Sequence, residues 1–144
     1  MGRYDLIRIN LISHTIEIND WTAIFLFSLD GYDDEEVLRE LLSCDPPDSI
    51  IDTVEGNLDA NVIDTGFTYS NSYIRRSVVY VSPSSSGKEF LSTFVHELAH
   101  LTCDICLADK ISLRGEKIAY LMGEIALRLS DIVCHLSCDI CREH

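Results

Sequence analysis

The stretch Phe94–Leu101, which reads FVHELAHL, places two histidines four residues apart with a glutamate directly after the first. Positions four apart lie on one face of a helix, so His96 and His100 can bind one metal ion together. Glu97 projects about 100° round the helix from His96, near enough to the open coordination position to act as a base toward a metal-activated water. The alternative is a chance match on a helix whose histidines pack or face water. The helical surroundings, with a strand before and acidic residues after, favour the metal site.

A helix is predicted around this motif, and a second helix after it. Ser86 is a good N-cap for the first helix, with Glu89 three residues later, and apolar residues at helical spacing continue to about residue 104 or 109. Residues 111–115 form a predicted turn. The last helix begins near Glu116 and runs almost to the C-terminus.

Upstream, β-branched and apolar residues predict a sheet. Residues 3–18 suggest one or two strands, and the apolar run Trp21–Leu29 fits a buried strand or a short buried helix, between which periodicity cannot decide. Two further strands are predicted at residues 65–70 and 72–82, pairing across Ser70–Asn71.

Between these strands lies an acidic segment with two short predicted helices. The first follows Asp33, and the second runs from a cap at Asp48 through Val54 until Gly56 ends it, with a loop over residues 57–64. The predicted fold class is therefore α+β, a single domain over residues 1–144. A short, mostly antiparallel sheet packs against the histidine helix and the long C-terminal helix.

Composition limits the function. The 144 residues suit one soluble domain, and no apolar run approaches the roughly 18 residues that cross a membrane. With no signal peptide, we expect a cytoplasmic protein without a membrane partner. Residues 1–72 carry 15 acids against 3 bases, so we expect no nucleic-acid partner. The acidity reads as a solubilising surface, although a basic partner also fits; the oligomeric state is not predicted.

A catalytic zinc site normally takes three protein ligands and leaves a fourth position for water. Two glutamates of the last helix are candidates for the third ligand. A tight hairpin about residue 112 brings Glu124 level with His100, whereas an early end to the first helix, near Cys106, brings Glu116 level instead.

The sequence H-E-L-A-H followed by Gly115–Tyr120, which reads GEKIAY, resembles the zincin metallopeptidases of the glutamate-ligand branch. It is also similar to small phage- and prophage-type H-E-x-x-H proteins, and the likeness covers roughly residues 65–127. The first 60 residues resemble nothing specific.

The resemblance implies a zinc ion (Zn²⁺) held by His96, His100 and Glu116, with Glu97 as the general base. It also implies that Val78–Val81 is the edge strand on which an extended peptide binds. Tyr120 stands where larger members carry an aspartate; it could hydrogen-bond a ligand or an oxyanion, or pack in the core.

Six cysteines include two copies of Cys-Asp-Ile-Cys, at 103–106 and 138–141. Both copies fall on predicted helices, which favours buried packing over a second metal site or a disulfide. Cys103 as a ligand of the histidine-bound metal would need three successive helical turns to face one ion, and is disfavoured.

The function expected from these residues is zinc-dependent hydrolysis of peptide bonds in a peptide or protein substrate, by a metal-activated water. The alternative is a non-catalytic, zincin-like interaction module of phage or mobile-element type that binds a protein partner. The substrate itself is not predicted.

Overall fold

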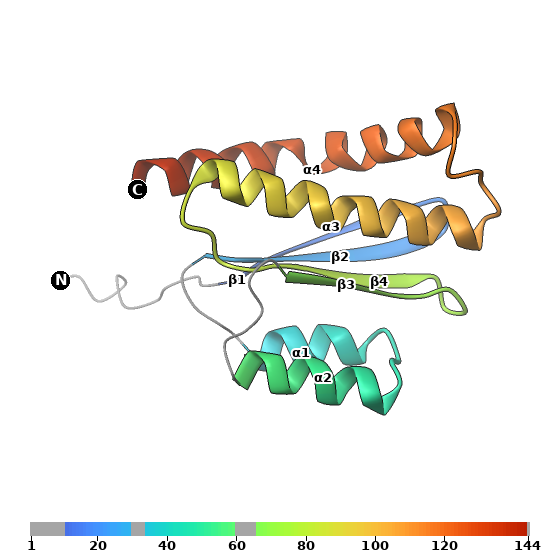
Figure 1. Ribbon diagram of the computed structural model, residues 1–144, viewed down its shortest axis with the longest axis horizontal. Helices are drawn as coiled ribbons and strands as arrows, with labels where there is room; N and C mark the ends of the chain where they lie inside the picture. Colours follow the sequence, from blue (N-terminus) through green and yellow to red (C-terminus); the bar gives the residue numbers. More distant parts are fainter. Residues whose placement is uncertain (1–10, 30–33, 60–65, 144) are drawn as a thin grey trace.

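The computed structural model of the protein describes residues 11–29, 34–59 and 66–143, and the side chains of residues 11–29, 34–59 and 66–140. Residues 3–10 of the predicted N-terminal strands and residues 60–64 of the predicted loop lie outside this part of the chain. The elements in chain order (Figure 1) are β1 (Leu11–Ile18), β2 (Trp21–Ser28), α1 (Asp34–Leu42), α2 (Asp48–Asp59), β3 (Gly66–Asn71), β4 (Arg76–Val81), α3 (Gly87–Ala108) and α4 (Glu116–Glu143).

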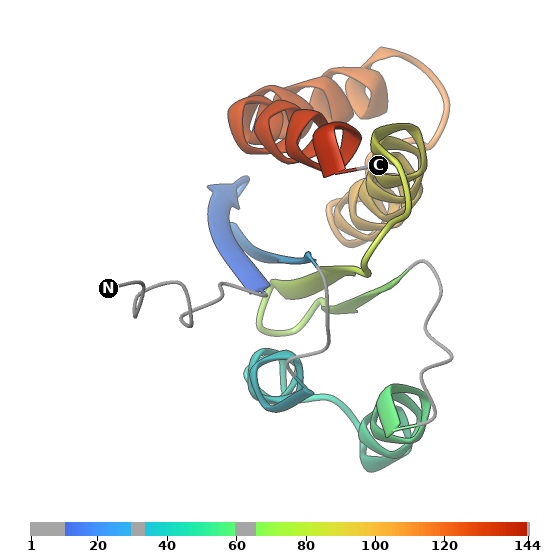
Figure 2. The ribbon, with the colours of Figure 1, turned by 90° about the vertical axis from the view of Figure 1, so that its left-hand side faces the viewer.

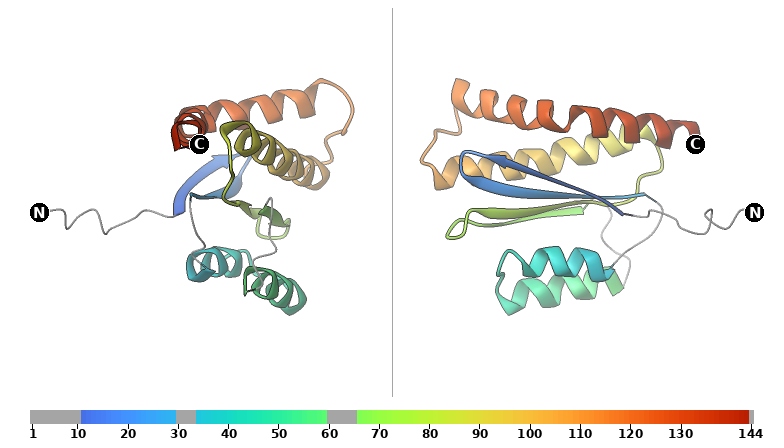
Figure 3. Two further views of the ribbon diagram at one scale, coloured as in Figure 1. Left: turned by 60° about the vertical axis from the view of Figure 1, so that its left-hand side comes forward. Right: turned by 180° about the vertical axis from the view of Figure 1, so that it is seen from behind.

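The fold has three layers, with the sheet in the middle. The strand order is β1-β2-β4-β3; β1 and β3 pair antiparallel with β2 and β4, whereas β2 and β4 run parallel. Figures 1 and 2 show α1 and α2 on one face of the sheet and α3 and α4 on the other, and the two views of Figure 3 agree. The α+β class is confirmed, and the four-stranded sheet is mixed.

The residues of β2 form a strand, and their burial explains why periodicity could not distinguish a strand from a helix. Phe25 and Phe27 point toward α3 and α4, whereas Ile24 and Leu26 point toward α1 and α2. All four side chains are buried. A strand covered on both faces loses the polar alternation that marks a half-exposed strand, so it reads as one apolar run.

The predicted helical hairpin is confirmed. Ser86 caps α3, its Oγ accepting from the backbone N–H of Glu89 at 3.1 Å. Apolar residues at helical spacing in α3 and α4 bury their side chains against each other and the sheet, among them Phe94, Leu98, Leu101, Ile105, Leu121, Ile125 and Leu129. Among the helices described, none is long and apolar enough to cross a membrane.

Two predicted boundaries and one predicted strand position are wrong. Helix α2 continues past Gly56 to Asp59, so residues 57–59 are helical rather than loop. The strands β3 and β4 turn at residues 72–75 instead of Ser70–Asn71. Strand β4, which contains Val78–Val81, is central rather than at the edge, because β2 pairs with its second side and β3 becomes the edge.

Arg75, in the turn between β3 and β4, joins three segments. Its guanidinium donates to Oδ1 of Asp109 at 2.7 Å and to Oδ2 at 3.2 Å, and these bonds hold the pKa of that carboxyl below its ordinary value. It also donates to the backbone carbonyls of Asn19 and Asp20 and lies 5.1 Å from the centre of the Trp21 ring. The tips of both strand pairs are thereby tied to the C-terminal end of α3.

Gly66 begins the edge strand, and we expect Gly66→Ala to lower the free energy of unfolding by about 2–4 kcal/mol. Its φ is +126°, and a Cβ there would lie 1.9 Å from the carbonyl oxygen of Tyr80. The matched control is Gly123→Ala in α4, where a Cβ meets nothing within 4 Å; it should stabilise the protein by about 0.5–1 kcal/mol. Urea denaturation measures both, and equal effects would contradict the close approach at Gly66.

Candidate metal centre

Helix α3 places the two histidines as the sequence predicts. Nε2 of His96 lies 3.3 Å from Nε2 of His100, and the ring centroids are 4.9 Å apart. Two imidazole nitrogens bound to one tetrahedral zinc ion at about 2.0–2.1 Å lie about 3.3 Å apart. The rings therefore already have the separation that a shared zinc ion needs. At this distance Nε2–H of one ring can donate a hydrogen bond to Nε2 of the other.

Glu97 occupies a different environment from the histidines beside it. Its side chain is only 3 % exposed, whereas that of His96 is 61 % exposed. Oε1 accepts a hydrogen bond from Oγ1 of Thr68 on β3 at 2.8 Å, while Oε2 lies 3.9 Å from Nε2 of His96. One carboxylate oxygen is thus fixed by the edge strand, and the other lies toward His96.

A second set of polar contacts joins α3 to the sheet at Asp104, two helical turns after this glutamate. Asp104 accepts a hydrogen bond from Ser70 at 2.6 Å, Ser70 and Ser77 are 2.7 Å apart, and the indole of Trp21 donates to Ser77 at 2.8 Å. The indole can only donate and the carboxylate only accepts. The hydroxyls of Ser77 and Ser70 therefore both donate in the direction of Asp104. The side of α3 that carries Glu97 is therefore held on β3 by hydrogen bonds as well as by packing.

Sequence reasoning missed this contact with β3. Thr68 and Ser70 alternate with Phe67 and Tyr69, whose rings pack on the α1 and α2 side. That alternation indicates one polar strand face, but nothing in the sequence says that α3 covers it.

The candidate third ligands lie away from the histidines. Glu116 is exposed at the first residue of α4. Helix α3 continues eight residues beyond His100 before it ends at Ala108, which is about 12 Å of helix. Within the described residues, no group of three or more His, Cys, Asp or Glu side chains is placed to hold a metal ion.

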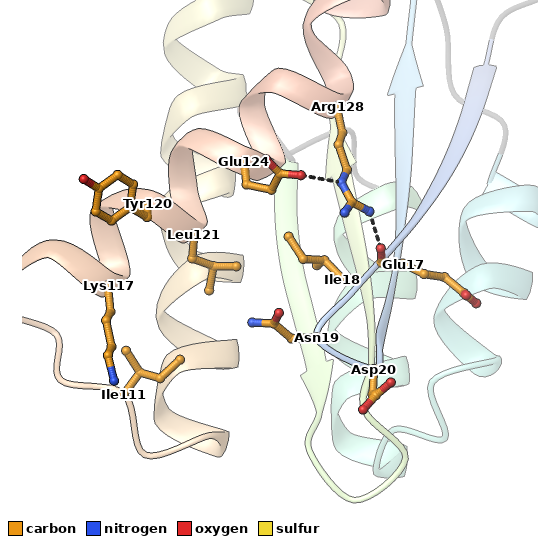
Figure 4. A pocket seen from close by; sticks show the side chains of 10 residues that line it. All are labelled: Glu17, Ile18, Asn19, Asp20, Ile111, Lys117, Tyr120, Leu121, Glu124 and Arg128. Atoms are coloured by element: carbon orange, nitrogen blue, oxygen red, sulfur yellow. Dashed lines mark hydrogen bonds and ion pairs between the residues drawn. The ribbon is translucent and has the colours of Figure 1, made fainter.

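Glu124 and Tyr120 line an open pocket beside the β1–β2 turn. The Glu124 carboxylate accepts from Arg128 at 3.0 Å, and Arg128 also donates to the backbone carbonyl of Glu17. Tyr120 is 73 % exposed and lines the same open pocket of about 680 Å³ (Figure 4). Leu121, Ile125 and Leu129 turn toward the core, and this packing fixes the rotation of α4.

The cysteines that the structure describes are free thiols. Cys44 and Cys106 are fully buried, and burial raises the pKa of both thiols. Cys103 is half-buried, whereas Cys134 and Cys138 are exposed on α4. The predicted packing of cysteines in the core is therefore confirmed for Cys106, whereas Cys134 and Cys138 are not packed there. The side chain of Cys141 lies outside the described residues.

Comparisons with protein-family models, with curated proteins and with solved structures gave no match.

Proposed function

We propose that this protein is a zinc-dependent metallopeptidase whose metal ion is held by His96 and His100. The observation that carries the proposal is the 3.3 Å separation of the two Nε2 atoms, which suits a shared tetrahedral ion. Imidazole nitrogen is a ligand that zinc prefers, and the exposed rings leave room for water and substrate.

Glu97 supplies the acid–base chemistry in this proposal. When bound, zinc lowers the pKa of a water and polarises the carbonyl of the substrate. Glu97 takes the proton from the attacking water through Oε2, the oxygen that faces His96, and passes it to the leaving amine. Thr68 is a positioning residue, because its hydroxyl holds Oε1 at 2.8 Å and so fixes the direction of Oε2.

Glu116 is the third ligand that the resemblance implies. In the helical hairpin as it stands, α3 continues about 12 Å beyond His100 before the chain turns back to Glu116. The hairpin would have to shorten by about two turns for Glu116 to reach the imidazoles, so this ligand is a separate hypothesis from the histidine pair.

A peptide substrate fits the site because β3 is a sheet edge. Among the strands that the structure describes, β3 pairs with β4 alone, and its Thr68 touches Glu97. An extended peptide of any sequence can pair with a free edge through backbone hydrogen bonds. Here the backbone of that peptide would pass beside Glu97 and the two imidazoles.

The experiment is incubation of the zinc-loaded protein with a mixture of synthetic peptides, followed by mass spectrometry. New peptide termini should form with zinc and disappear when a chelator is added. A zinc-loaded protein that cleaves no peptide would contradict the proposal and favour the non-catalytic interaction module.

A further inference from the structure

A cavity of about 420 Å³ lies beside the C-terminal end of β3. Its walls are the α1–α2 connection, residues 45–47, and the end of the β3–β4 hairpin, residues 69–73. Asn71 joins the two walls: its Nδ2 donates to the carbonyl of Cys44 at 3.0 Å, and its Oδ1 accepts from the backbone N–H of Tyr73 at 3.0 Å. These hydrogen bonds fix the two walls of the cavity relative to each other.

The side chains that line this cavity suit a cation. Tyr69 and Tyr73 supply two aromatic rings, and Tyr73 is 97 % exposed. The carboxylate of Asp45 is exposed and has no hydrogen bond or ion pair within the part of the chain that the structure describes. Among the eight lining residues none is basic. Aromatic faces and an unpaired carboxylate together attract an ammonium or guanidinium group.

The helical layer beside the cavity is negatively charged, as Asp45 is. Residues 34–59, which form the α1 and α2 layer, carry nine acidic side chains and one basic side chain. This layer covers one face of the sheet (Figure 2). Its field raises the local concentration of positively charged chains and lowers that of negatively charged ones.

The position of the cavity relates it to the histidine site. Thr68, which contacts Glu97, and Tyr69, which lines the cavity, are adjacent on β3 but face opposite sides of the sheet. Asn71, at the end of the strand, is about 10 Å from Thr68. Side chains of a peptide paired with β3 would alternate in the same way. One side of the peptide would meet α3, and a residue three positions along would meet the cavity from the other side.

We propose that this cavity is a subsite for an arginine or lysine side chain of an extended peptide bound along the edge of β3, with Asp45 as its counter-charge and Tyr69 and Tyr73 as its walls. The inference rests on the proposed peptidase function for its substrate class. It makes the substrates cationic peptides with a basic residue about three positions from the bond that is cleaved.

The test uses the Glu97→Gln protein, so that the probe is not consumed, with zinc present. The probes are fluorescein-labelled heptapeptides of alternating Thr and Val that carry arginine, norleucine or glutamate at the centre, and binding is measured by fluorescence anisotropy. We expect the arginine peptide to bind about tenfold more tightly than the norleucine peptide. In Asp45→Asn this preference should disappear while the norleucine peptide binds as before. Asparagine also tolerates the φ of +51° at this position.

A second variant keeps the test independent of the backbone at Asp45. Tyr73→Ser changes an almost fully exposed side chain, and it should lower the preference for arginine without changing the thermal unfolding curve. Equal binding of the three peptides, no binding of any of them, or an unchanged preference in Asp45→Asn would overturn the subsite. Zinc content is measured on the same samples. An arginine preference in a protein that holds no zinc would defeat only the metallopeptidase, whereas zinc-dependent cleavage without the preference would defeat only the subsite.

Discussion

Glu97→Gln is expected to lower the rate of peptide hydrolysis by about a thousandfold while zinc stays bound. General-base catalysis typically contributes about 10²–10⁴ to a rate, and a carboxamide cannot take the proton from water. The substitution keeps the shape of the side chain, and its carboxamide oxygen can still accept the bond from Thr68 that the structure shows at 2.8 Å. The measurement is the cleavage rate of a peptide found by the mass-spectrometric assay, with zinc content determined on the same sample.

The control for this variant is Glu89→Gln, which removes an exposed carboxylate from the first turn of the same helix. It should leave the cleavage rate within about twofold of wild type, since exposed charges far from a site act weakly. Cleavage by the Glu97→Gln protein at the wild-type rate would show that Glu97 is not the base.

The second large effect concerns metal binding. His96→Ala and His100→Ala should each lower zinc affinity by about a hundredfold or more, because each removes one of the two imidazoles that define the site. Both side chains are exposed, so neither variant should disturb the core. The measurement is calorimetric titration of the metal-free protein with zinc.

Controls on the other helix separate this site from adventitious binding. His135→Ala removes an exposed histidine of α4, and Cys134→Ser with Cys138→Ser removes the exposed thiols. Both should bind zinc as the wild-type protein does. Zinc affinity that falls when the thiols are removed and survives in His96→Ala would place the metal on α4.

Glu116→Gln, tested beside these variants, decides the third ligand. A loss of zinc affinity comparable to that of the histidine variants would require a shorter hairpin than the structure has.

The sequence predicts the elements close to the histidines well because local rules govern them. The cap at Ser86, the separation of His96 and His100, and the burial of Leu98 and Leu101 follow from helix geometry alone. The α+β class follows from the order of the helical and strand patterns.

Features that depend on contacts between distant elements were not predictable in the same way. The parallel pairing of β2 with β4 makes β3 the edge, and only the full topology reveals this. The bond from Thr68 to Glu97 spans 29 residues. The side of α4 that faces β1 is set by how Leu121 and Ile125 fill the core. For that reason the spacing between His100 and either candidate glutamate could not identify a third ligand.

The most direct test of the metal centre is a crystal structure of the zinc-loaded protein with anomalous diffraction data at the zinc absorption edge. We expect one anomalous peak between the two imidazoles, about 2.0–2.1 Å from each Nε2 atom. A protein that shows no peak there, with His96 and His100 joined only by a hydrogen bond at full zinc loading, would contradict the account.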